Sequence, residues 1–246
     1  MGELFERRFV QEVYDDIADH FSSTRFSVWP AVSSFIDSLS EYSLVCDVGC
    51  GNGKNMIASF LKNHIPFGCD SSIELCRLAE TSFSNRDALC DVVHGDGLFT
   101  NFPSNSFDAV LSIAVVHHFS TVERRLAAVK ELYRMSRSGG RVMVTVWAHG
   151  QAKMSKWKAI SIKNDGEFEF TEKSQDYIIP WHLRKSFINK PQKEDLATDY
   201  RGDPIYGRYY HLFIEKELDK LMEDANFAIE SSYFDHDNYV VIGRKE

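Results

Sequence analysis

Three closely spaced glycines follow a short apolar run and could form a ligand-binding turn. The apolar run is Leu44–Val48, and Gly49, Gly51 and Gly53 alternate with other residues directly after it. We predict a buried parallel strand that leads into a tight turn and then a helix. Gly49 would permit the turn, Gly51 would let a ligand approach the bare backbone, and Gly53 would let the helix begin close to the sheet.

The acid Asp47, two residues before the first glycine, bears on the type of ligand. A dinucleotide pyrophosphate suits the spacing G-x-G-x-x-G, whereas the third glycine here comes one residue early. A carboxylate is also unfavourable beside a bound phosphate. The turn therefore favours a ligand with a cationic end, such as the amino-acid part of S-adenosylmethionine. A glycine turn without any ligand is the alternative.

Two more acids follow predicted strands. The strand Ile65–Asp70 ends in an acid about 20 residues after the glycines, where nucleoside-binding folds use a carboxylate to accept hydrogen bonds from ribose hydroxyls. The strand Asp91–His94 leads to a polar turn at 95–97 that could reach an adenine amine. The predicted cofactor-binding residues are Asp47, Gly49, Cys50, Gly51, Gly53, Asp70, Ser71, Asp96, Gly97 and Ala114.

Alternating strands and helices would position these groups. Further strands are expected at 107–115 and 141–147, a hairpin at 227–234 and 239–243, and helices at 4–21, 30–39, 52–63, 121–137 and 215–226. Gly139 and Gly140 would end the helix at 121–137. This order predicts an α/β, Rossmann-like fold with a mostly parallel seven-stranded sheet, helices on both faces and a C-terminal antiparallel hairpin. The glycine turn, Asp70, Asp96 and the pair His117-His118 all fall at carboxyl ends of strands, where such sheets bind ligands.

Composition limits the class of protein. With 246 residues and 43% hydrophobic content, residues 1–246 can form a single domain. The net charge of −8 argues against binding nucleic acid by bulk charge alone. No secretory signal and no apolar run of membrane-spanning length is evident. The five cysteines form no Cys-x-x-Cys pair, so we expect reduced thiols in a cytoplasmic or nuclear protein and no metal site.

The alternation fails between about residues 149 and 208, which we interpret as an insertion. Residues 148–208 hold eleven Lys and Arg, including Lys190 and Lys193, against nine acids, so this stretch is about +2 and the remainder about −10. A long irregular insertion is typically a substrate loop, and Tyr177, Trp181 and His182 could stack on bases. A mobile surface loop is the alternative.

The turn at 47–54, Asp70, the turn at 96–98 and the terminal hairpin resemble class I S-adenosylmethionine-dependent methyltransferases. An ordered set of strings along almost the whole chain is similar to a narrower family, the eukaryotic tRNA wobble-uridine carboxyl methyltransferases. That family is similar to the methyltransferase domain fused to an AlkB-type hydroxylase in animals. The strings are Val13-Tyr14-Asp15, His20-Phe21-Ser22, Thr24-Arg25, Trp29-Pro30, residues 112–118, Glu123-Arg124-Arg125, Pro180-Trp181 and residues 208–212.

The resemblance implies methyl esterification of 5-carboxymethyluridine at the wobble position of tRNA. It also implies a small zinc-binding activator protein that forms a heterodimer with the chain and covers an apolar edge of the sheet. The largely apolar strand at 107–115 and the acidic body support such a partner. The insertion departs from the family because it is short and only mildly basic.

The chemistry would need positioning more than proton transfer, because a carboxylate is ionised at neutral pH. Residues 1–40 would form helices over the active site. We expect catalytic roles for Arg25, as a bidentate partner of the carboxylate, and for His117 and Tyr14; Trp29, His118, Trp181, Arg208 and His211 would contact the substrate. Each of these residues except Arg25, His117 and Trp181 has an alternative role. Tyr14 and Trp29 could be core aromatics, His118 could be a packed histidine, and Arg208 and His211 could be plain surface residues.

Two other classes of protein stay open. The shared fold would also suit a methyltransferase of a small metabolite, against which Arg25 and Pro180-Trp181 argue. A cofactor-binding but catalytically silent scaffold is the second.

Overall fold

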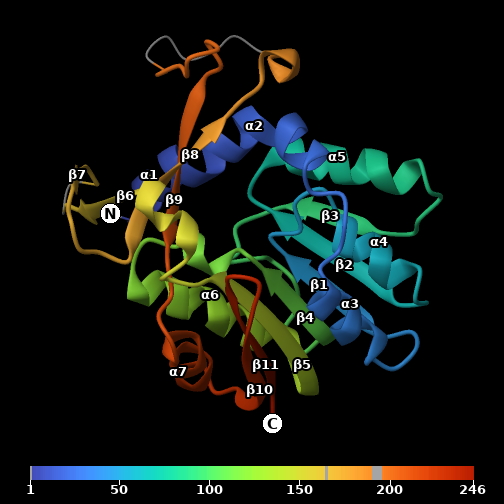
Figure 1. Cartoon of the computed structure of the whole chain (residues 1–246). Coiled ribbons are helices and arrows are strands. Elements are labelled where there is room, and N and C mark those ends of the chain that lie inside the picture. The colour runs from blue at the N-terminus through green and yellow to red at the C-terminus, as the bar shows by residue number, and fades with distance from the viewer. Residues whose placement is uncertain (1, 164–165, 190–195) are drawn as a thin grey trace.

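The computed structural model describes residues 2–163, 166–189 and 196–246, so Lys190 and Lys193 lie outside the described residues. The described residues form a seven-stranded sheet and a four-stranded sheet. Figure 1 shows the four-stranded sheet standing above one end of the seven-stranded sheet. No helix in the described ranges is both long and apolar enough to cross a bilayer.

The seven-stranded sheet has the order β10-β11-β5-β4-β1-β2-β3. Its first five strands along the chain run parallel, and the last two form an antiparallel hairpin whose inner strand pairs with β5. This confirms the predicted parallel sheet and terminal hairpin. The strands are β1 (Leu44–Val48), β2 (Ile65–Asp70), β3 (Asp91–His94), β4 (Phe107–Ile113), β5 (Ser136–Trp147), β10 (Ala228–Asp235) and β11 (Asn238–Arg244).

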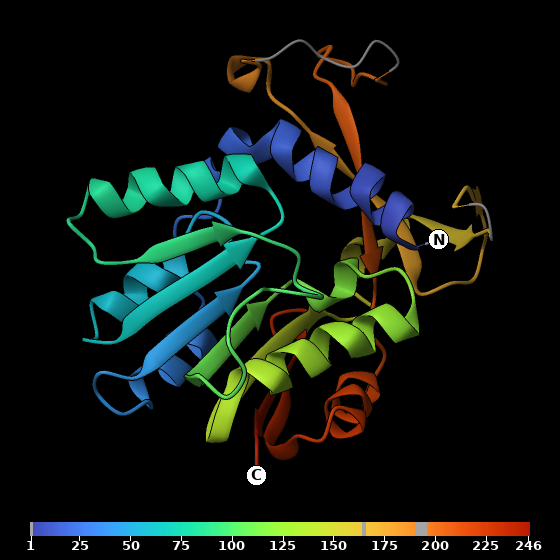
Figure 2. The ribbon, with the colours of Figure 1, turned by 180° about the vertical axis from the view of Figure 1, so that it is seen from behind.

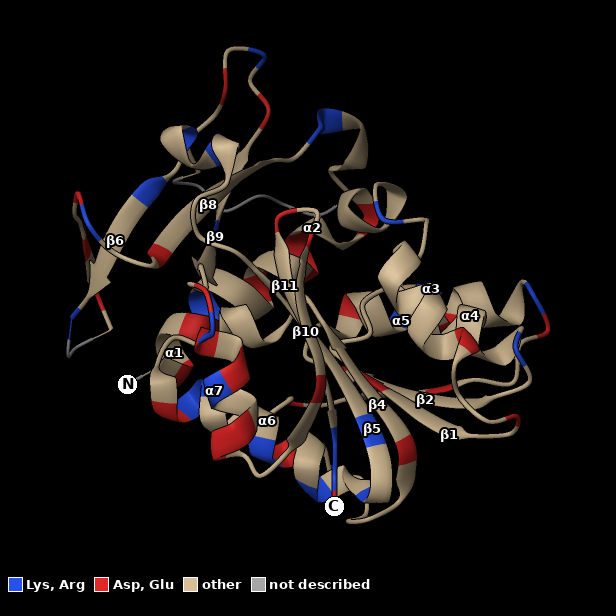
Figure 3. Ribbon diagram, turned by 60° about the horizontal axis from the view of Figure 1, so that its bottom comes forward, with Lys and Arg blue, Asp and Glu red and all other residues tan. Residues whose placement is uncertain are grey.

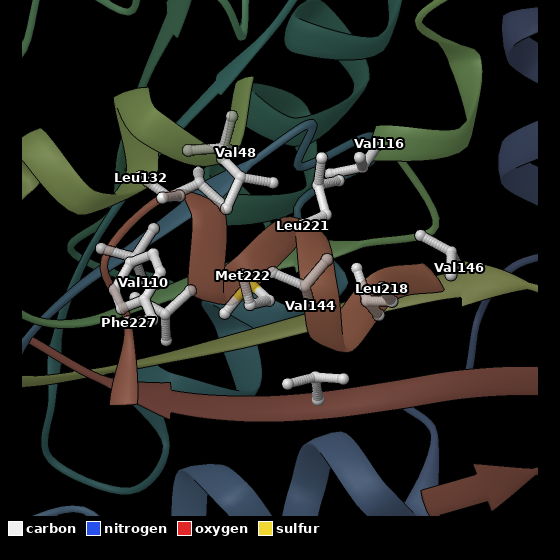
Figure 4. Packing of buried hydrophobic residues seen from close by; sticks show 14 of the residues in the cluster. Val48, Val110, Val116, Leu132, Val144, Val146, Leu218, Leu221, Met222 and Phe227 are labelled. Atoms are coloured by element: carbon white, nitrogen blue, oxygen red, sulfur yellow. The ribbon is translucent and has the colours of Figure 1, made fainter. Parts of the chain in front are cut away.

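Helices cover both faces of this sheet. Strand side chains alternate between faces, so Val110 packs with α6 and α7, as Figure 4 shows, while Ala109 and Leu111 pack with α3. Residues of α4 and α5 form a further cluster with Val92 of β3. The helices are α3 (Pro30–Asp37), α4 (Lys54–Phe60), α5 (Ile73–Ser84), α6 (Val122–Met135) and α7 (Glu217–Asp224).

Two details differ from the expectations. Helix α6 ends at Met135, before the glycine pair, because Ser136 already pairs with Phe107 of β4. Strand β4 lies in the middle of the sheet between β1 and β5, and both of its faces are covered. Its apolar character therefore reflects burial within the chain and gives no support for a partner protein.

The N-terminal segment is one helical run of α1 (Gly2–Glu6), the π-helical turn η1 (Arg7–Gln11) and α2 (Glu12–Ser23). The expected helix at 4–21 is confirmed and is longer at its C-terminal end. Figures 1 and 2 show α2 lying between the four-stranded sheet and α5. Its apolar residues Val13 and Ile17 pack against Leu183 and Tyr206 of the insertion.

The prediction of an irregular insertion is wrong. Residues 149–208 contribute most of an antiparallel sheet of order β7-β6-β8-β9. Its strands are β6 (Lys158–Ile162), β7 (Phe168–Phe170), β8 (Asp176–His182) and β9 (Ile205–His211). Strands β8 and β9 pair over seven residues each, although most of the described residues between them (183–189 and 196–204) have no regular structure.

Candidate functional site

A cavity of about 340 Å³ opens at the carboxyl ends of β1, β2 and β4. Its size falls within the range of small-molecule sites. The N-terminal segment contributes part of its wall through residues such as Tyr14, and the residues that follow α2 add Arg25 and Trp29. Both sheets border it, since Trp147 ends β5 and Tyr210 belongs to β9. We call this space the main cavity.

The three glycines of the turn are required for different reasons. All have positive φ, between +57° and +77°, which disfavours other residues. A Cβ at Gly49 would lie 2.3 Å from Val115, whereas a Cβ at Gly51 would meet nothing within 4 Å and would enter the main cavity. A Cβ at Gly53 would lie 2.5 Å from Phe83 of α5, so this glycine serves helix–helix packing and not the approach to the sheet that we expected.

The backbone N–H groups of the turn are already used. Gly49 and Cys50 donate to the carbonyl of Cys69, and Gly51 donates to a carboxylate oxygen of Asp70 at 2.8 Å. A phosphate-binding loop would instead present such groups to its ligand. The turn thus offers open space above Gly51 and an acid beside it, in agreement with a ligand that is not an anion. Burial raises the pKa of the Cys50 thiol well above its usual range, so the thiol stays protonated.

Asp70 ends β2 with its carboxylate at the cavity wall. Its two oxygens accept from the N–H groups of Gly51 and Ser72, at 2.8 and 2.9 Å. Each oxygen has a further lone pair that a ribose hydroxyl could use. Burial raises the pKa of Asp70, and these two hydrogen bonds oppose the rise. Ser71, Asp96 and Gly97 also line the cavity, while one Asp96 oxygen accepts from Leu98 N at 2.9 Å.

Asp47 lies behind the cavity wall. Its side chain is buried and accepts from the Asn55 amide at 3.2 Å, and Asn55 itself lines the cavity. Burial raises the pKa of Asp47 to about 7, which the hydrogen bond from Asn55 and the nearby Lys54 ammonium only partly offset. Asp47 can therefore act on a ligand through Asn55 and through its charge, and not by the direct contact we expected.

The end of β4 carries backbone strain. Ala114 lines the cavity with a φ of +61°, an uncommon conformation for a residue with a Cβ. Its N–H group is held by the carbonyl and the hydroxyl of Thr145 on β5, each at 3.0 Å. Strain of this kind persists where the surroundings fix it and is frequent at functional sites.

His117 presents one ring nitrogen for which the described residues provide no partner. Its Nδ1 accepts from the backbone N–H of Trp147 at 3.0 Å, so in the neutral ring the proton lies on Nε2. That Nε2 is buried and has no protein partner among the described residues, and His117 lines the cavity. Burial lowers the pKa of His117 well below 6.5, and His118 and Arg208 add to this effect. The residue is therefore a neutral hydrogen-bond donor.

His118 is a packed histidine with both nitrogens satisfied, although its ring also lines the cavity. Its Nδ1 donates to the carbonyl of Tyr209 at 2.8 Å, and its Nε2 accepts from the Tyr14 hydroxyl at 3.2 Å. Tyr14 accepts in turn from Tyr210 at 3.0 Å, and Tyr210 accepts from Arg208 at 2.7 Å. Burial lowers the pKa of His118 to about 3. This chain of hydrogen bonds joins α2 to β9 and leaves His118 no nitrogen for a substrate.

Arg25 and Trp29 both line the cavity from the segment after α2. The Arg25 guanidinium lies 5.3 Å from the centre of the Phe21 ring and 5.9 Å from that of Trp181. Its hydrogen bonds within the described residues go to Thr24. The planar group is thus oriented by aromatic rings while its other N–H groups can meet a ligand.

Three predicted substrate residues lie outside the main cavity. Arg208 is buried, with its guanidinium 4.8 Å from the Trp181 ring centre. His211 is buried between the carboxylates of Asp176 and Glu217, at 2.9 and 2.8 Å. The expectation that Arg208 and His211 meet the tRNA backbone is wrong, because protein groups surround both. Trp181 stands behind Phe21, at 5.8 Å between ring centres.

Several cavity residues were missed by the sequence analysis. Trp147 stacks on Tyr210 at 4.5 Å and 20°, and its place at the carboxyl end of β5 could have revealed it. Tyr210 had no such signal because its strand was not recognised. Lys54 and Asn55 directly follow the glycine turn, so their closeness to the predicted ligand could have been recognised from the sequence.

In the described ranges no group of His, Cys, Asp and Glu has the arrangement of a metal site.

Solved structures share this fold. A SAM-dependent methyltransferase from Methanosarcina mazei has a TM-score of 0.65 and 20% identity, covering 89% of this chain and 98% of its own. A putative methyltransferase from Haloferax volcanii, solved in complex with the Trm112 methyltransferase activator, has a TM-score of 0.62 and 13% identity, covering 96% of both chains. The architecture is thus that of class I methyltransferases.

Sequence relatives narrow the assignment. Residues 46–144 match a family model described as a methyltransferase domain. The tRNA (carboxymethyluridine(34)-5-O)-methyltransferase alkbh8 of Xenopus tropicalis is 38% identical over the whole of this chain, which spans 42% of that relative. The tRNA (carboxymethyluridine(34)-5-O)-methyltransferase of Schizosaccharomyces pombe is 38% identical over 98% of both chains. The chain therefore belongs to the tRNA (carboxymethyluridine(34)-5-O)-methyltransferase family.

Proposed function

We propose that this protein transfers a methyl group from S-adenosylmethionine to the carboxylate of 5-carboxymethyluridine at the wobble position of tRNA. The observation that carries the proposal is the pairing, in one cavity, of a glycine turn with a half-buried arginine and a neutral histidine donor. Full-length similarity to the Schizosaccharomyces pombe methyltransferase supports it.

The main cavity fits the cofactor. The open space above Gly51, which a Cβ would fill, allows a ligand against the backbone, and Asp70 and Asp96 offer carboxylate oxygens to hydroxyl and amine groups. Asp47, behind Asn55, places an acid near the turn, which suits a cationic ligand. When bound, S-adenosylmethionine supplies a sulfonium methyl group that the substrate carboxylate takes to give a methyl ester and a neutral thioether.

The protein residues position the substrate. A carboxylate titrates near pH 4, about 3 units below neutral, so it needs no general base. Arg25 can hold it through two parallel N–H groups, and the Nε2–H of His117 can donate to the uracil or to the carboxylate. Trp147, Tyr210 and Phe119 give the cavity apolar walls that exclude water.

The RNA would approach from the side of the insertion. Both signs of charge occur along these strands and loops in Figure 3, so we expect local contacts and not a broad basic face. Several aromatic residues of the insertion lie beside the main cavity, which suits recognition of unpaired bases.

We also propose a small zinc-binding activator that pairs with the edge strand β3. This strand has only β2 as a neighbour in the described sheet, and Val93 on it is 38% exposed. Leu89, two residues before the strand, and Phe99, five residues after it, are 79% and 67% exposed. An open edge flanked by apolar side chains is suited to strand addition by another chain.

A tRNA-modifying enzyme with reduced cysteines would work in the cytoplasm or the nucleus.

The reaction can be tested with synthetic anticodon stem-loops. We expect the purified protein, alone or with a co-purified activator, to convert a stem-loop with 5-carboxymethyluridine at the wobble position into the methyl ester, seen by nucleoside mass spectrometry. A stem-loop with unmodified uridine is the control and should give no product. Binding of S-adenosylmethionine without product on the modified stem-loop, with the activator present, would contradict the proposal and favour a silent scaffold.

A further inference from the structure

A second depression lies on the far side of Trp181 from the main cavity. It has a volume of about 460 Å³, is open to solvent, and is formed by α2, β8 and the loops around β8 and β9. Its lining residues are His20, Pro180, Trp181, His182, Arg184, Asp199, Tyr200, Arg201 and Asp203. We call it the outer depression.

The outer depression combines aromatic rings with cations. Tyr200 is 87% exposed, and the Arg201 guanidinium lies 5.0 Å from its ring centre and donates to its hydroxyl at 2.7 Å. Arg184 is exposed on the same depression. An exposed ring beside guanidinium groups is the arrangement with which proteins stack a base and hold its phosphate.

Two residues that line the same space have polar atoms enclosed by protein. His20 is 6% exposed and stacks on Phe187 at 4.7 Å and 21°, yet its Nδ1 has no protein partner in the described part of the chain. The indole Nε1 of Trp181 is likewise buried without a partner there. Because both nitrogens are enclosed by protein, His20 and Trp181 contribute ring surface to the depression and not these hydrogen-bonding groups.

The acids of the depression are used internally. One oxygen of Asp199 accepts from the N–H groups of Arg201 and Asp203, at 2.8 and 3.0 Å, and the other lies 3.1 Å from His182 Nδ1. Asp203 accepts from Lys185 N at 3.2 Å. These carboxylates hold the loop together, which leaves the depression suited to an anion with an aromatic part.

Aromatic side chains separate the two spaces. The Trp181 ring centre lies 5.2 Å from that of His20, which lines the outer depression, and 5.8 Å from that of Phe21, which lines the main cavity. Phe21 and Arg25 line the main cavity. A strand of RNA with one base in the main cavity would therefore bring a neighbouring nucleotide over this aromatic wall.

We propose that the outer depression binds a nucleotide adjacent to the wobble position, with its base against Tyr200 and Trp181 and its phosphate at Arg184 and Arg201. The inference rests on the proposed function, because it takes the anticodon loop as the substrate. It assigns Trp181 to the flanking nucleotide and not to the base that is methylated.

The phosphate contacts can be measured without methyl transfer. A fluorescent anticodon stem-loop is titrated with the full chain at several KCl concentrations, comparing Arg184→Gln/Arg201→Gln with the matched surface control Lys216→Gln/Lys220→Gln at α7. We expect the double variant to bind about tenfold more weakly, with a salt slope shallower by about 0.7 per lost phosphate contact. The control should match the wild type. Equal affinity and slope in all three proteins would overturn the proposal.

The base contact has its own test. Tyr200→Ala should weaken binding of the intact stem-loop by about fivefold or more, the range for loss of base stacking. It should not weaken binding of a stem-loop whose flanking position is abasic. An equal loss on both RNAs, or no loss on either, would contradict base stacking here. If these binding differences appear but 5-carboxymethyluridine is not methylated, the proposed reaction fails and the subsite stands; if methylation occurs and binding is unchanged, the reaction stands and the subsite fails.

Discussion

At the scale of single residues, the cavity side chains differ in what the protein has left unsatisfied. His118 has protein partners at both nitrogens, whereas His117 keeps a buried Nε2 with none among the described residues. The Arg25 guanidinium is oriented by two rings, and its hydrogen bonds within the described structure go only to Thr24. Atoms without a protein partner are those that a substrate can use, so Arg25 and His117 are the residues to test.

Arg25 is predicted to act by orientation. A carboxylate and a sulfonium become neutral during the transfer, so an arginine that only neutralised charge would stabilise the ground state more than the transition state. Lysine keeps the charge but lacks the planar fork. We expect Arg25→Lys to keep cofactor affinity and Tm near wild type and to lower kcat/KM about tenfold or more, roughly 1.4 kcal/mol. Arg25→Ala should lose more, largely in KM. Full activity of Arg25→Lys, or its unfolding, would contradict this role.

The role of His117 as a hydrogen-bond donor can be tested with two amide substitutions, His117→Asn and His117→Gln. Asn mimics the Nδ1 acceptor, and Gln can extend an amide towards the position of Nε2. Both lose the packing of the ring, so they are compared with each other. We expect His117→Asn to lower kcat about tenfold more than His117→Gln, because only the longer side chain can replace the donor. The low pKa of His117, caused first by burial, keeps the ring neutral, so the wild-type rate should not titrate with this residue between pH 6 and 8. A rate that follows a pKa near 6.5 and loses that dependence in His117→Asn would refute the neutral donor.

Gly51 is predicted to serve binding and not folding. Gly51→Ala and Gly139→Ala are matched, since both residues have positive φ and neither Cβ would meet an atom within 4 Å. Each should lose about 1 kcal/mol of stability from left-handed strain. Only Gly51→Ala should also weaken S-adenosylmethionine binding, by about tenfold or more in calorimetry. Gly51→Val should abolish it. Equal affinity for S-adenosylmethionine in Gly51→Ala and Gly139→Ala would show that the cofactor does not bind at this turn.

At the scale of elements, the N-terminal segment is fixed to the fold by a buried carboxylate. One oxygen of Glu6 on α1 accepts from the N–H and hydroxyl of Ser120, at 2.6 and 2.8 Å, and both oxygens accept from Arg124 of α6. Glu6 also lines the main cavity. This cluster determines where the N-terminal wall of the cavity lies.

Glu6→Ala should therefore loosen that wall. The change leaves the Arg124 guanidinium and the Ser120 N–H without their acceptor, at a cost of up to about 3 kcal/mol. We expect faster hydrogen exchange across 2–23 and a higher KM for the cofactor, with Glu6→Gln intermediate. Glu3→Gln, on the exposed side of α1, is the control and should behave as wild type. Unchanged exchange at 2–23 in Glu6→Ala would contradict the anchoring.

The elements also show what the sequence could predict. Strands β1 and β2 were recognisable because each is a largely apolar run that ends in a turn with glycine or acids, and β4 because it is an apolar run that leads to the pair His117-His118. Strand β8 was not, since Pro180 interrupts its pattern and its partner β9 begins 23 residues after β8 ends, at Ile205 against His182. Arg208 and His211 were placed on the surface because charged residues usually lie there. Their partners Tyr14 and Glu217 belong to other elements, which local patterns do not reveal.

At the scale of the whole molecule, charged contacts bond the four-stranded sheet to the main fold. His211 of β9 lies between Asp176 of β8 and Glu217 of α7, so the four-stranded sheet is bonded to a helix of the main fold. Burial lowers the pKa of His211, but the hydrogen bonds to Asp176 and Glu217 outweigh it and the net shift is upward. The four-stranded sheet, which contributes Tyr210 to the cavity wall, is thus fixed to the main fold.

The open edge at β3 predicts dependence on a partner. We expect the chain alone to be poorly soluble or poorly active, and co-purification to recover a small zinc-binding protein. Val93→Lys on β3 should weaken that association, because charge on an edge strand opposes strand addition. Ser84→Lys, at the exposed end of α5, should not. A monodisperse and fully active monomer would contradict the prediction.

The hydrogen bond between Tyr14 and Tyr210 has a consequence for how the protein is made. The two residues are 196 positions apart, so a ribosome must synthesise most of the chain before the contact can form. During that time the apolar face of α2, with Val13 and Ile17, has no insertion to cover it. Contacts of such long separation slow folding and leave apolar surface open to association. Helix α2 is therefore expected to reach its final place only after β9 has been made, and its apolar face stays open to association until then.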